Sequence, residues 1–335
     1  MARTGTFGGF HFDPDVFTAY MQERDTVNPV LIETGVLEPN QAIANAIANE
    51  GNVFTIPLYQ PLNGDAKNYD GNTNNTPEEV SAKKQTGMSF RRMNAWKSKD
   101  FTKEISGADP MGDIAGKVAK YIQKNNQKDL LAILNGVLGV SGMETHVLDK
   151  STTTESVKET NYLDPEDIIT LSANSLGADL SAYSMVAMHS MVYANLMKKN
   201  LIEFTKQVSA EAMQENPYKG ELLGLPIVID DTLTVTQDSH SQNQYSTYLL
   251  GQGVIQTAPV RIDRPNSVSY DPETAGGIEK LYTKWGRAMH PNGFSFAVNN
   301  TASESPTREE LGNKSNWSLV MDAKNIAIAK IVSNG

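Results

Sequence analysis

The sequence predicts an α+β chain with one long amphipathic helix, a projecting hairpin and a regular run of helices and strands. Residues 109–139 repeat apolar side chains at helical spacing, which predicts a helix roughly 40 Å long at about 1.5 Å per residue. Residues 53–96 contain two strand-like stretches around a polar tip. Residues 163–258 alternate helix and strand patterns, as compact α/β subdomains do. We expect the long helix to act as a structural spine.

The predicted spine helix has clear start and stop signals. Asp109 can accept hydrogen bonds from the free N–H groups of the first turn, and Pro110 suits the first helical position. Gly139 is a suitable end, although Gly136 would end the helix a turn earlier. The apolar stripe consists of Ile114, Val118, Ile122, Leu130, Leu134 and Val137. One narrow stripe on so long a helix is typical of a helix that lies across a sheet or along another molecule.

The segments before the spine predict an arm and an extended loop. Residues 1–52, with a short helix at 13–25, offer too little apolar surface to fold alone, so we expect them to lie on another surface. The loop, 53–96, is predicted as a hairpin with strands at 53–60 and 88–96. Pro57 marks an edge position in its first strand, and 63–79 form a long exposed tip. A projecting hairpin with uncovered edges implies contact with another subunit.

The segments after the spine predict a subdomain followed by a sheet. Beyond a surface excursion at 138–161, helices are predicted at 166–176 and 190–200, and strands at 185–189, 225–230 and 245–250. The later strands are expected at 259–264, 294–298 and 325–332, beneath the spine helix. A turn is predicted at 290–293, with His290 as a turn residue, and the polar stretch 301–316 is interpreted as a loop.

Composition excludes several classes of protein. The 335 residues are 39% apolar and 20% charged, which is ordinary for a soluble domain. The net charge of −10 argues against a general nucleic-acid binder, which normally carries a basic face. The absence of cysteine excludes disulfides, thiolate metal sites and thiol catalysis. We find no apolar run of membrane-spanning length and no signal-peptide pattern, and we expect synthesis in the cytoplasm.

A cluster of basic residues stands out in this acidic chain. Its members are Lys83, Lys84, Arg91, Arg92, Lys97, Lys99 and Lys103. They can form a solvated hairpin face, or they can dock on an acidic patch of a neighbouring subunit. The candidate subunit interface consists of Lys83, Lys84, Arg91, Arg92, Trp96, Lys97 and Lys99. A third interpretation is nucleic-acid binding, in which Phe90 and Trp96 stack on bases.

The sequence offers little support for an enzyme. Asp230 and Asp231 follow a strand, as metal-binding carboxylates often do, but adjacent strand side chains point to opposite faces, which favours a structural turn or cap. The histidines are scattered; His189 is predicted as a core or capping residue. No phosphate-binding loop, nucleophile elbow or dinucleotide fingerprint is present. We therefore expect no catalytic residues, no metal and no cofactor.

Six blocks in this order resemble the major capsid proteins of tailed bacteriophages (Caudoviricetes). They are GADPM at 107–111, QKDLLAILNGV at 127–137, MHSMVYANL at 188–196, GLPIVIDD at 224–231, YLLGQG at 248–253 and WGRAMHPNGF at 285–294. The resemblance covers roughly residues 50–300. It implies the Hong Kong 97-type coat fold, with 1–52 as the N-terminal arm and 53–96 as the extended loop. The peripheral domain would then comprise 97–162 and 259–335, and the axial domain 163–258.

The resemblance also implies a function and partners. A coat protein associates with itself as homo-pentamers and homo-hexamers, which form an icosahedral virion shell around packaged DNA in the host bacterial cytoplasm. The chain has no long coiled-coil-like N-terminal extension, which favours a separate scaffolding protein; a portal and a decoration protein are further implied partners, and no membrane is. Some relatives cross-link subunits through a Lys and an Asn; Lys83 or Lys84 could serve, but no motif carries this over.

Two other functions remain open from the sequence. The first keeps the fold but changes the role, to an encapsulin-like compartment or a gene-transfer particle. The second is a metal-dependent enzyme with an acidic site at Asp230 and Asp231. Tight binding of a divalent ion that is lost on Asp230→Ala would favour the enzyme.

Overall fold

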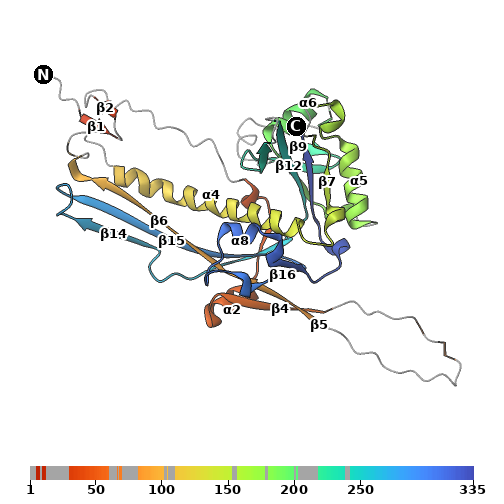
Figure 1. The fold of residues 1–335 in the computed structure, drawn as a ribbon, viewed down its shortest axis with the longest axis horizontal. Helices are drawn as coiled ribbons and strands as arrows, with labels where there is room; N and C mark the ends of the chain where they lie inside the picture. The colour runs from red at the N-terminus through yellow and green to blue at the C-terminus, as the bar shows by residue number, and fades with distance from the viewer. Residues whose placement is uncertain are drawn as a thin grey trace, which may run out of the picture.

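The computed structural model describes residues 5–7, 10–12, 30–59, 66, 68–69, 82–101, 104, 110–152, 157–177, 180–199, 201–202, 218–237 and 242–335. The helix predicted at 13–25, the capping role of Asp109 and nearly all of the tip at 63–79 lie outside these residues. In the described chain, a long helix crosses a sheet of long strands, and a second sheet stands at the end of this helix (Figure 1). No helix in this part combines the length and apolar character needed to cross a lipid bilayer.

The bounds of the elements are as follows. The helices are α2 (Gln41–Glu50), α4 (Pro110–Leu138), α5 (Pro165–Leu176), α6 (Ser190–Lys198) and α8 (Arg308–Gly312). The early strands are β1 (Gly5–Phe7), β2 (Phe10–Phe12), β3 (Leu37–Pro39), β4 (Val53–Tyr59), β5 (Ala82–Met88), β6 (Phe90–Lys99) and β7 (Val147–Asp149). The middle strands are β8 (Met185–Met188), β9 (Tyr218–Leu222), β10 (Leu225–Ile229), β11 (Val235–Gln237), β12 (Asn243–Leu250) and β13 (Ile255–Pro259). The late strands are β14 (Asn266–Asp271), β15 (Ile278–Pro291), β16 (Phe294–Phe296), β17 (Trp317–Leu319) and β18 (Ile328–Ser333).

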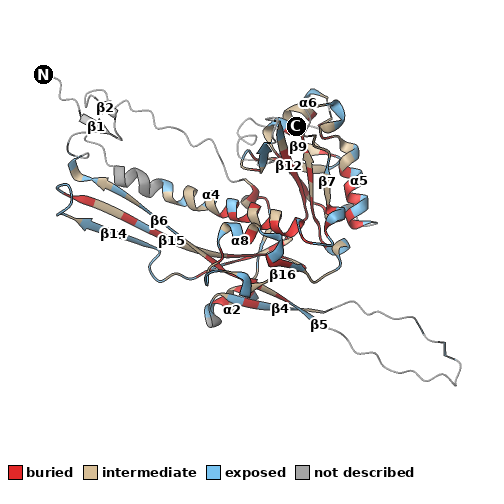
Figure 2. Cartoon of the chain, in the orientation of Figure 1, coloured by how far each residue is buried: buried red, intermediate tan, exposed pale blue. Residues whose placement is uncertain are grey.

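The predicted spine is α4, whose 29 residues confirm the long helix. Its second half is buried: Leu130, Leu134 and Val137 are fully enclosed between the two sheets. Val118 and Ile122, nearer the start, are only half-buried. Figure 2 shows this change along the helix, from tan to red. The apolar stripe therefore packs in two regions, and the packing is tighter along the C-terminal half of the helix.

The sheet beneath α4 has the order β14-β15-β13-β3, and β6 lies along the other edge of β15. This arrangement corrects the second strand predicted for the hairpin. The returning strand of the hairpin is β5, which pairs with β4 from Val53↔Met88 to Tyr59↔Ala82. The predicted strand at 88–96 instead belongs to β6, which is paired with β15 over its whole length. The difference has a physical reason: side chains of a strand point alternately to its two faces, so one face of β6 packs on α4 through Arg92, Asn94 and Trp96.

The second sheet has the order β7-β18-β12-β8-β10-β9, with β11 also paired to β12. Successive residues of β8 show its two covered faces: Met185 and Ala187 pack in the cluster that includes α4, and Val186 and Met188 in the cluster with α5 and α6. The predictions of α5, β8, α6, β10 and β12 are confirmed.

Three predictions in the C-terminal part were wrong. The strand at 325–332 exists as β18, but it lies between β7 and β12 rather than under the spine. Its side chains are buried on both faces, which requires a sheet covered on both sides. No strand spans 259–264, because β13 already ends at Pro259. The stretch 301–316 contains α8, which is stabilised by a capping box between Thr307 and Glu310.

Part of the predicted arm packs on the body of this same chain. β3 pairs in parallel with β13, and α2 places Ile43 and Ile47 in a small core. The other members of this core are Phe54, Ala258, Val260 and Ala288. Residues 37–50 thus gain the apolar cover that they lack alone. The division of the chain into arm, loop, peripheral and axial domains stays a prediction.

Candidate functional site

The β4–β5 hairpin is fixed to the body at its root. The backbone N–H of Thr86 donates to Ser295 Oγ at 3.1 Å, and the N–H of Gly293 donates to Gln85 Oε1 at 3.2 Å. The described part of the hairpin lies beside β16 (Figure 1). Its strands are therefore oriented by β16 and by the turn before it.

The hairpin carries two of the predicted interface residues, Lys83 and Lys84, and both are exposed. Lys83 Nζ donates to the carbonyl of Val320 at 3.1 Å, so this lysine is held within the chain. Lys84 lies opposite Pro57 on β4. Pro57 is exposed, and the outer edge of β4 pairs with no strand in the described chain, which confirms the edge position predicted for this proline.

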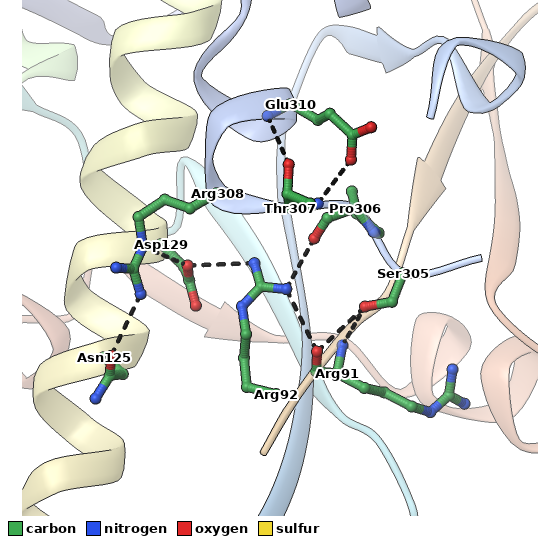
Figure 3. Close-up of polar contacts among 9 residues, drawn as sticks. All are labelled: Arg91, Arg92, Asn125, Asp129, Ser305, Pro306, Thr307, Arg308 and Glu310. Atoms are coloured by element: carbon green, nitrogen blue, oxygen red, sulfur yellow. Dashed lines mark hydrogen bonds and ion pairs between the residues drawn. The ribbon is translucent and has the colours of Figure 1, made fainter. Parts of the chain in front are cut away.

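Arg92 joins a buried charge cluster instead of facing solvent (Figure 3). Its Nη2 lies 3.3 Å from Asp129 Oδ1, and Arg308 Nε on α8 lies 2.9 Å from the same oxygen. The side chain of Asp129 is 0% exposed. Arg92 Nη1 also donates to the carbonyl of Pro306 at 2.8 Å. The cluster joins α4, β6 and α8, so Arg92 has a structural role within the chain.

The neighbouring Arg91 points away from Asp129 in Figure 3. Its backbone N–H donates to Ser305 Oγ at 2.8 Å, and the Ser305 hydroxyl donates back to the Arg91 carbonyl at 3.2 Å. This reciprocal pair ties the start of β6 to the segment that precedes α8. Arg91 therefore contributes its backbone to the fold.

Trp96 packs against the spine helix. Its ring meets Tyr121 edge-on at 5.2 Å between centroids, and Tyr121 meets Trp285 in the same way at 6.0 Å. Phe90, on the same strand, is 0% exposed. Because these rings contact the core or α4, they do not form the stacking platform that single-strand nucleic-acid binding requires. The structure thus removes the aromatic part of that interpretation.

The opposite face of β6 is exposed and basic. Directly opposed residues of antiparallel strands share a face, so Lys97 lies beside Lys280 of β15, and Met93 beside Lys284. Lys99 lies on the same face as Lys97, two residues along β6. We call Lys97, Lys99, Lys280 and Lys284 the lysine surface.

The lysine surface has little internal compensation. Lys280 makes an ion pair with Asp271 at 3.4 Å, and no other ion pair to these lysines is found among the described residues. Like charges directly opposite one another on a sheet repel, as Lys97 and Lys280 do. Met93 is 81% exposed in their midst, and Tyr282 is 39% exposed. Cations interleaved with apolar and aromatic side chains are suited to an acidic protein partner.

Asp230 and Asp231 do not form a chelating pair. Asp230 is buried and accepts from the N–H of Thr232 at 2.8 Å and from the buried Gln127 of α4. Asp231 turns toward Ser190, whose N–H donates to its carboxylate at 3.2 Å. The structural interpretation of this pair, a turn and a cap, is confirmed. Among the described residues, no group of three His, Asp or Glu side chains is placed to hold a metal ion.

Two histidines test the sequence interpretation. His189 Nδ1 accepts from the N–H of Met191 at 3.2 Å and so caps α6, as predicted. His290 was predicted as a turn residue, but it lies inside β15 and is completely buried. The turn begins two residues later, at Asn292, because β15 extends through Pro291.

Sequence reasoning missed four residues of these sites. Asp129 and Arg308 lie 37 and 216 residues from Arg92 along the chain, so no local pattern connects them. Lys280 and Lys284 could have been found from the alternation along 278–287, which places them on the face opposite Leu281. Their proximity to Lys97 depends on the pairing of β15 with β6.

Comparison with known proteins identifies the family. The chain is 27% identical over 321 residues to the major capsid protein of Bacillus phage SPP1, covering 95% of this chain and 94% of that one. Its fold is similar to the capsid of Ralstonia phage GP4, with a TM-score of 0.58, 9% identity and coverage of 84% and 83% of the two chains. It is also similar to the encapsulin of Synechococcus elongatus PCC 7942, with a TM-score of 0.50, 9% identity and coverage of 96% and 95%.

These similarities agree with the architecture. The spine helix across a sheet, the hairpin and the second sheet together form the Hong Kong 97-type phage capsid fold, and the predicted α+β class is confirmed. The family described as Gp13-like, Major capsid protein 13-like, matches residues 44–327, which is most of the chain. The chain therefore belongs to the Gp13-like family of phage major capsid proteins.

Proposed function

We propose that this capsid protein assembles as pentamers and hexamers that close into the icosahedral head around the phage genome. The β4–β5 hairpin carries the proposal. Its described strands end at Tyr59 and Ala82, and the outer edge of β4 has no strand partner among the described residues (Figure 1). An uncovered edge is suited to contact with another copy, so the hairpin of one subunit would lie over its neighbour. A closed shell multiplies such modest contacts through its geometry.

The predicted division of the chain belongs to this proposal. Residues 1–52 would serve as the arm, 53–96 as the extended loop, and 97–162 with 259–335 as the peripheral domain. Residues 163–258 would form the axial domain, and their convergence would form the centre of each ring. Since β7 and β18 pair into the axial sheet, the peripheral and axial parts share a continuous core.

A direct test is to express the chain alone and with its candidate scaffolding protein, and to image both preparations by negative-stain electron microscopy. Closed shells, or rings of five or six subunits, are expected. Dispersed monomers in both preparations, unchanged at raised concentration or salt, would overturn the proposal. The proposal also includes a portal and a decoration protein as partners, and assembly in the host cytoplasm. Shells purified from infected cells should contain both partner proteins.

We further infer that the lysine surface contacts an acidic patch of a neighbouring copy. Of the predicted interface residues, Lys84, Lys97 and Lys99 are exposed and make no ion pair within the described chain. Arg92 and Trp96 are already held by α4, which leaves them to support the strand. The surface is basic on a chain with a net charge of −10, so copies can attract one another through complementary patches.

Charge reversal tests this contact. The double variant Lys97→Glu with Lys99→Glu should fold normally and assemble poorly, because two attractions become repulsions. Lys324→Glu, another exposed lysine reversed in the same way, should assemble like the parent chain. Assembly would be followed by light scattering at several salt concentrations, since screening weakens exposed charge pairs. Equal assembly by the double variant and the parent chain would exclude the lysine surface as an interface.

The encapsulin similarity shows the fold alone, and it motivates a second candidate, an encapsulin-like compartment. The two functions differ in what the shell encloses. Nucleic acid recovered from purified shells supports the phage head, whereas a co-purified enzyme supports the compartment. The 27% identity to a phage major capsid protein over nearly the full length of both chains favours the head.

A further inference from the structure

His290 lies on β15 at the root of the hairpin, where its side chain is completely enclosed. Its ring meets Phe54 of β4 edge-on, with 5.5 Å between centroids, and tilts against Trp317 of β17 at 6.3 Å. Neither ring nitrogen makes a hydrogen bond of normal geometry among the described residues. A buried polar ring without partners is unusual, because such groups are nearly always hydrogen-bonded.

Both strands of the hairpin rest on this ring. A side-chain carbon added at Gly87 of β5 would stand 2.8 Å from His290 Nδ1 and 2.3 Å from the Phe54 ring, so the backbone of β5 packs directly on them. Phe54 contributes the contact from β4. His290 therefore packs against both strands of the hairpin at the position where the hairpin joins the body.

The surroundings offer no charge that could balance a protonated ring. The strands packed on His290, namely β4, β13, β16 and β17, carry no Asp, Glu, Lys or Arg. The charged residues of β5 are Lys83 and Lys84, which are exposed. Arg287, on β15, donates to Thr257 Oγ1 at 2.9 Å. A positive charge on His290 would thus have no counter-charge on these strands.

We propose that His290 is an acid-sensitive latch: its neutral ring holds the hairpin against the body, and protonation releases the hairpin root. The latch acts within one chain and does not depend on assembly. Its consequence for the shell rests on the proposed function, because a released hairpin would present a different surface to the neighbouring copy. Acid would then loosen contacts between subunits.

The direction of the pH effect follows from the environment of the ring. Burial lowers the pKa of His290 from 6.5 to about 4, and a backbone group of Phe294 offsets this slightly. An exposed ring in the released state takes up its proton near the ordinary value, before the docked ring does. Opening should therefore increase as the pH falls below about 6.5 and level off near pH 4, by up to roughly 300-fold.

Hydrogen exchange measured by mass spectrometry tests the latch on the full-length chain. Peptides covering 53–59 and 82–88 should lose protection between pH 6.5 and 4, after correction for the intrinsic pH dependence of exchange. In His290→Leu, which cannot be protonated, this extra loss should disappear. His146→Leu is the matched control, because His146 is equally buried but lies in the turn after α4, so its substitution should leave the effect intact.

The same loss of protection in His290→Leu and in the parent chain would overturn the latch. If the leucine variant fails to fold, His290→Gln offers a second uncharged side chain for the same comparison. Because the measurement is made on the unassembled subunit, it reports on the hairpin within one chain and does not depend on shell formation. Failure of the latch and failure of the assembly proposal are therefore distinguishable.

Discussion

At Asp129, one buried carboxylate oxygen takes hydrogen bonds from arginines on two different elements, Arg92 on β6 and Arg308 on α8. Asp129→Ala would leave Arg92, whose side chain is only 18% exposed, without its partner. Removing one partner of a buried ion pair costs about 3 kcal/mol or more, because an uncompensated charge stays behind. We expect a loss of this size in the free energy of unfolding, measured by urea denaturation of the unassembled subunit.

Two further substitutions, one in the Asp129 cluster and one beside it, serve as controls for this prediction. Arg308 is 41% exposed, so Arg308→Ala should cost less, about 1 kcal/mol. Glu309→Ala changes an exposed neighbour on α8 and should lie within about 0.5 kcal/mol of the parent chain. If Asp129→Ala were no more costly than Glu309→Ala, the cluster would contribute nothing to the joint.

Asp230 is a buried carboxylate whose charged form is disfavoured by its surroundings. Burial raises the pKa of Asp230, and hydrogen bonds from Thr232 and Gln127 lower it in part. A raised pKa in the folded state means that folding favours the neutral carboxyl, so this group costs stability as the pH rises through its pKa. Gln127 Oε1 is buried without a partner, so an amide at position 230 could donate to it after the Gln127 amide flips.

Asp230→Asn should therefore keep the stability of the parent chain within about 1 kcal/mol at neutral pH, whereas Asp230→Ala should lose about 2 kcal/mol by leaving buried donors unpaired. The asparagine variant should also become less sensitive to pH between 4 and 8, because its side chain does not titrate. Thermal melts across this pH range test both statements. A large loss in Asp230→Asn would mean that the charge itself is needed.

At the scale of elements, Gly136 marks where the spine helix meets α8. A side-chain carbon there would stand 2.5 Å from the carbonyl oxygen of Leu311 and 2.9 Å from Trp317 Nε1. Gly136→Ala should therefore destabilise the chain by about 1–3 kcal/mol through overpacking, despite a helix-propensity gain near 1 kcal/mol. Gly312→Ala is the control, since its nearest atoms lie at 3.7 and 3.8 Å. Thermal denaturation that ranks the two substitutions in the opposite order would contradict the tight approach.

Elements with a strong local signal could be predicted from the sequence. The spine is such a case, because its period, Pro110 and the glycine at its end agree over many turns. The five-residue helix α8 was missed, although Thr307 and Glu310 form a capping box, since so short an apolar pattern carries little weight within a polar stretch. The same limit explains why a strand was predicted at 259–264, where the structure has an irregular segment between β13 and β14.

At the scale of the whole molecule, the missing information is long-range pairing. The sequence correctly predicts β18 as a strand, but no local pattern indicates that Ile328 lies opposite Leu250. The candidate site shows the same difference between local and long-range information. The sequence identifies the basic residues of β6. Which of them lie on the buried face with Arg92, and which on the exposed face with Lys97, depends on where α4 lies. The predicted basic cluster is therefore divided: Arg92 stabilises the fold, and Lys97 and Lys99 form an exposed surface.

The largest assembly prediction concerns the hairpin as a whole. Tyr59 and Ala82 are directly opposed in the last pair of β4 and β5, so residues 60–81 can be replaced by an Asn-Gly turn that matches a two-residue hairpin. The root contacts of Thr86 and Gln85 stay intact, and the stability of the isolated subunit should change by less than about 1 kcal/mol.

Shell formation should fail, because a shortened hairpin can no longer reach across a neighbour. A second variant, with a Gly-Ser linker of the original length, separates reach from side-chain contacts. Shells of normal yield and size from the short variant, seen by electron microscopy, would show that assembly does not use the hairpin beyond its root.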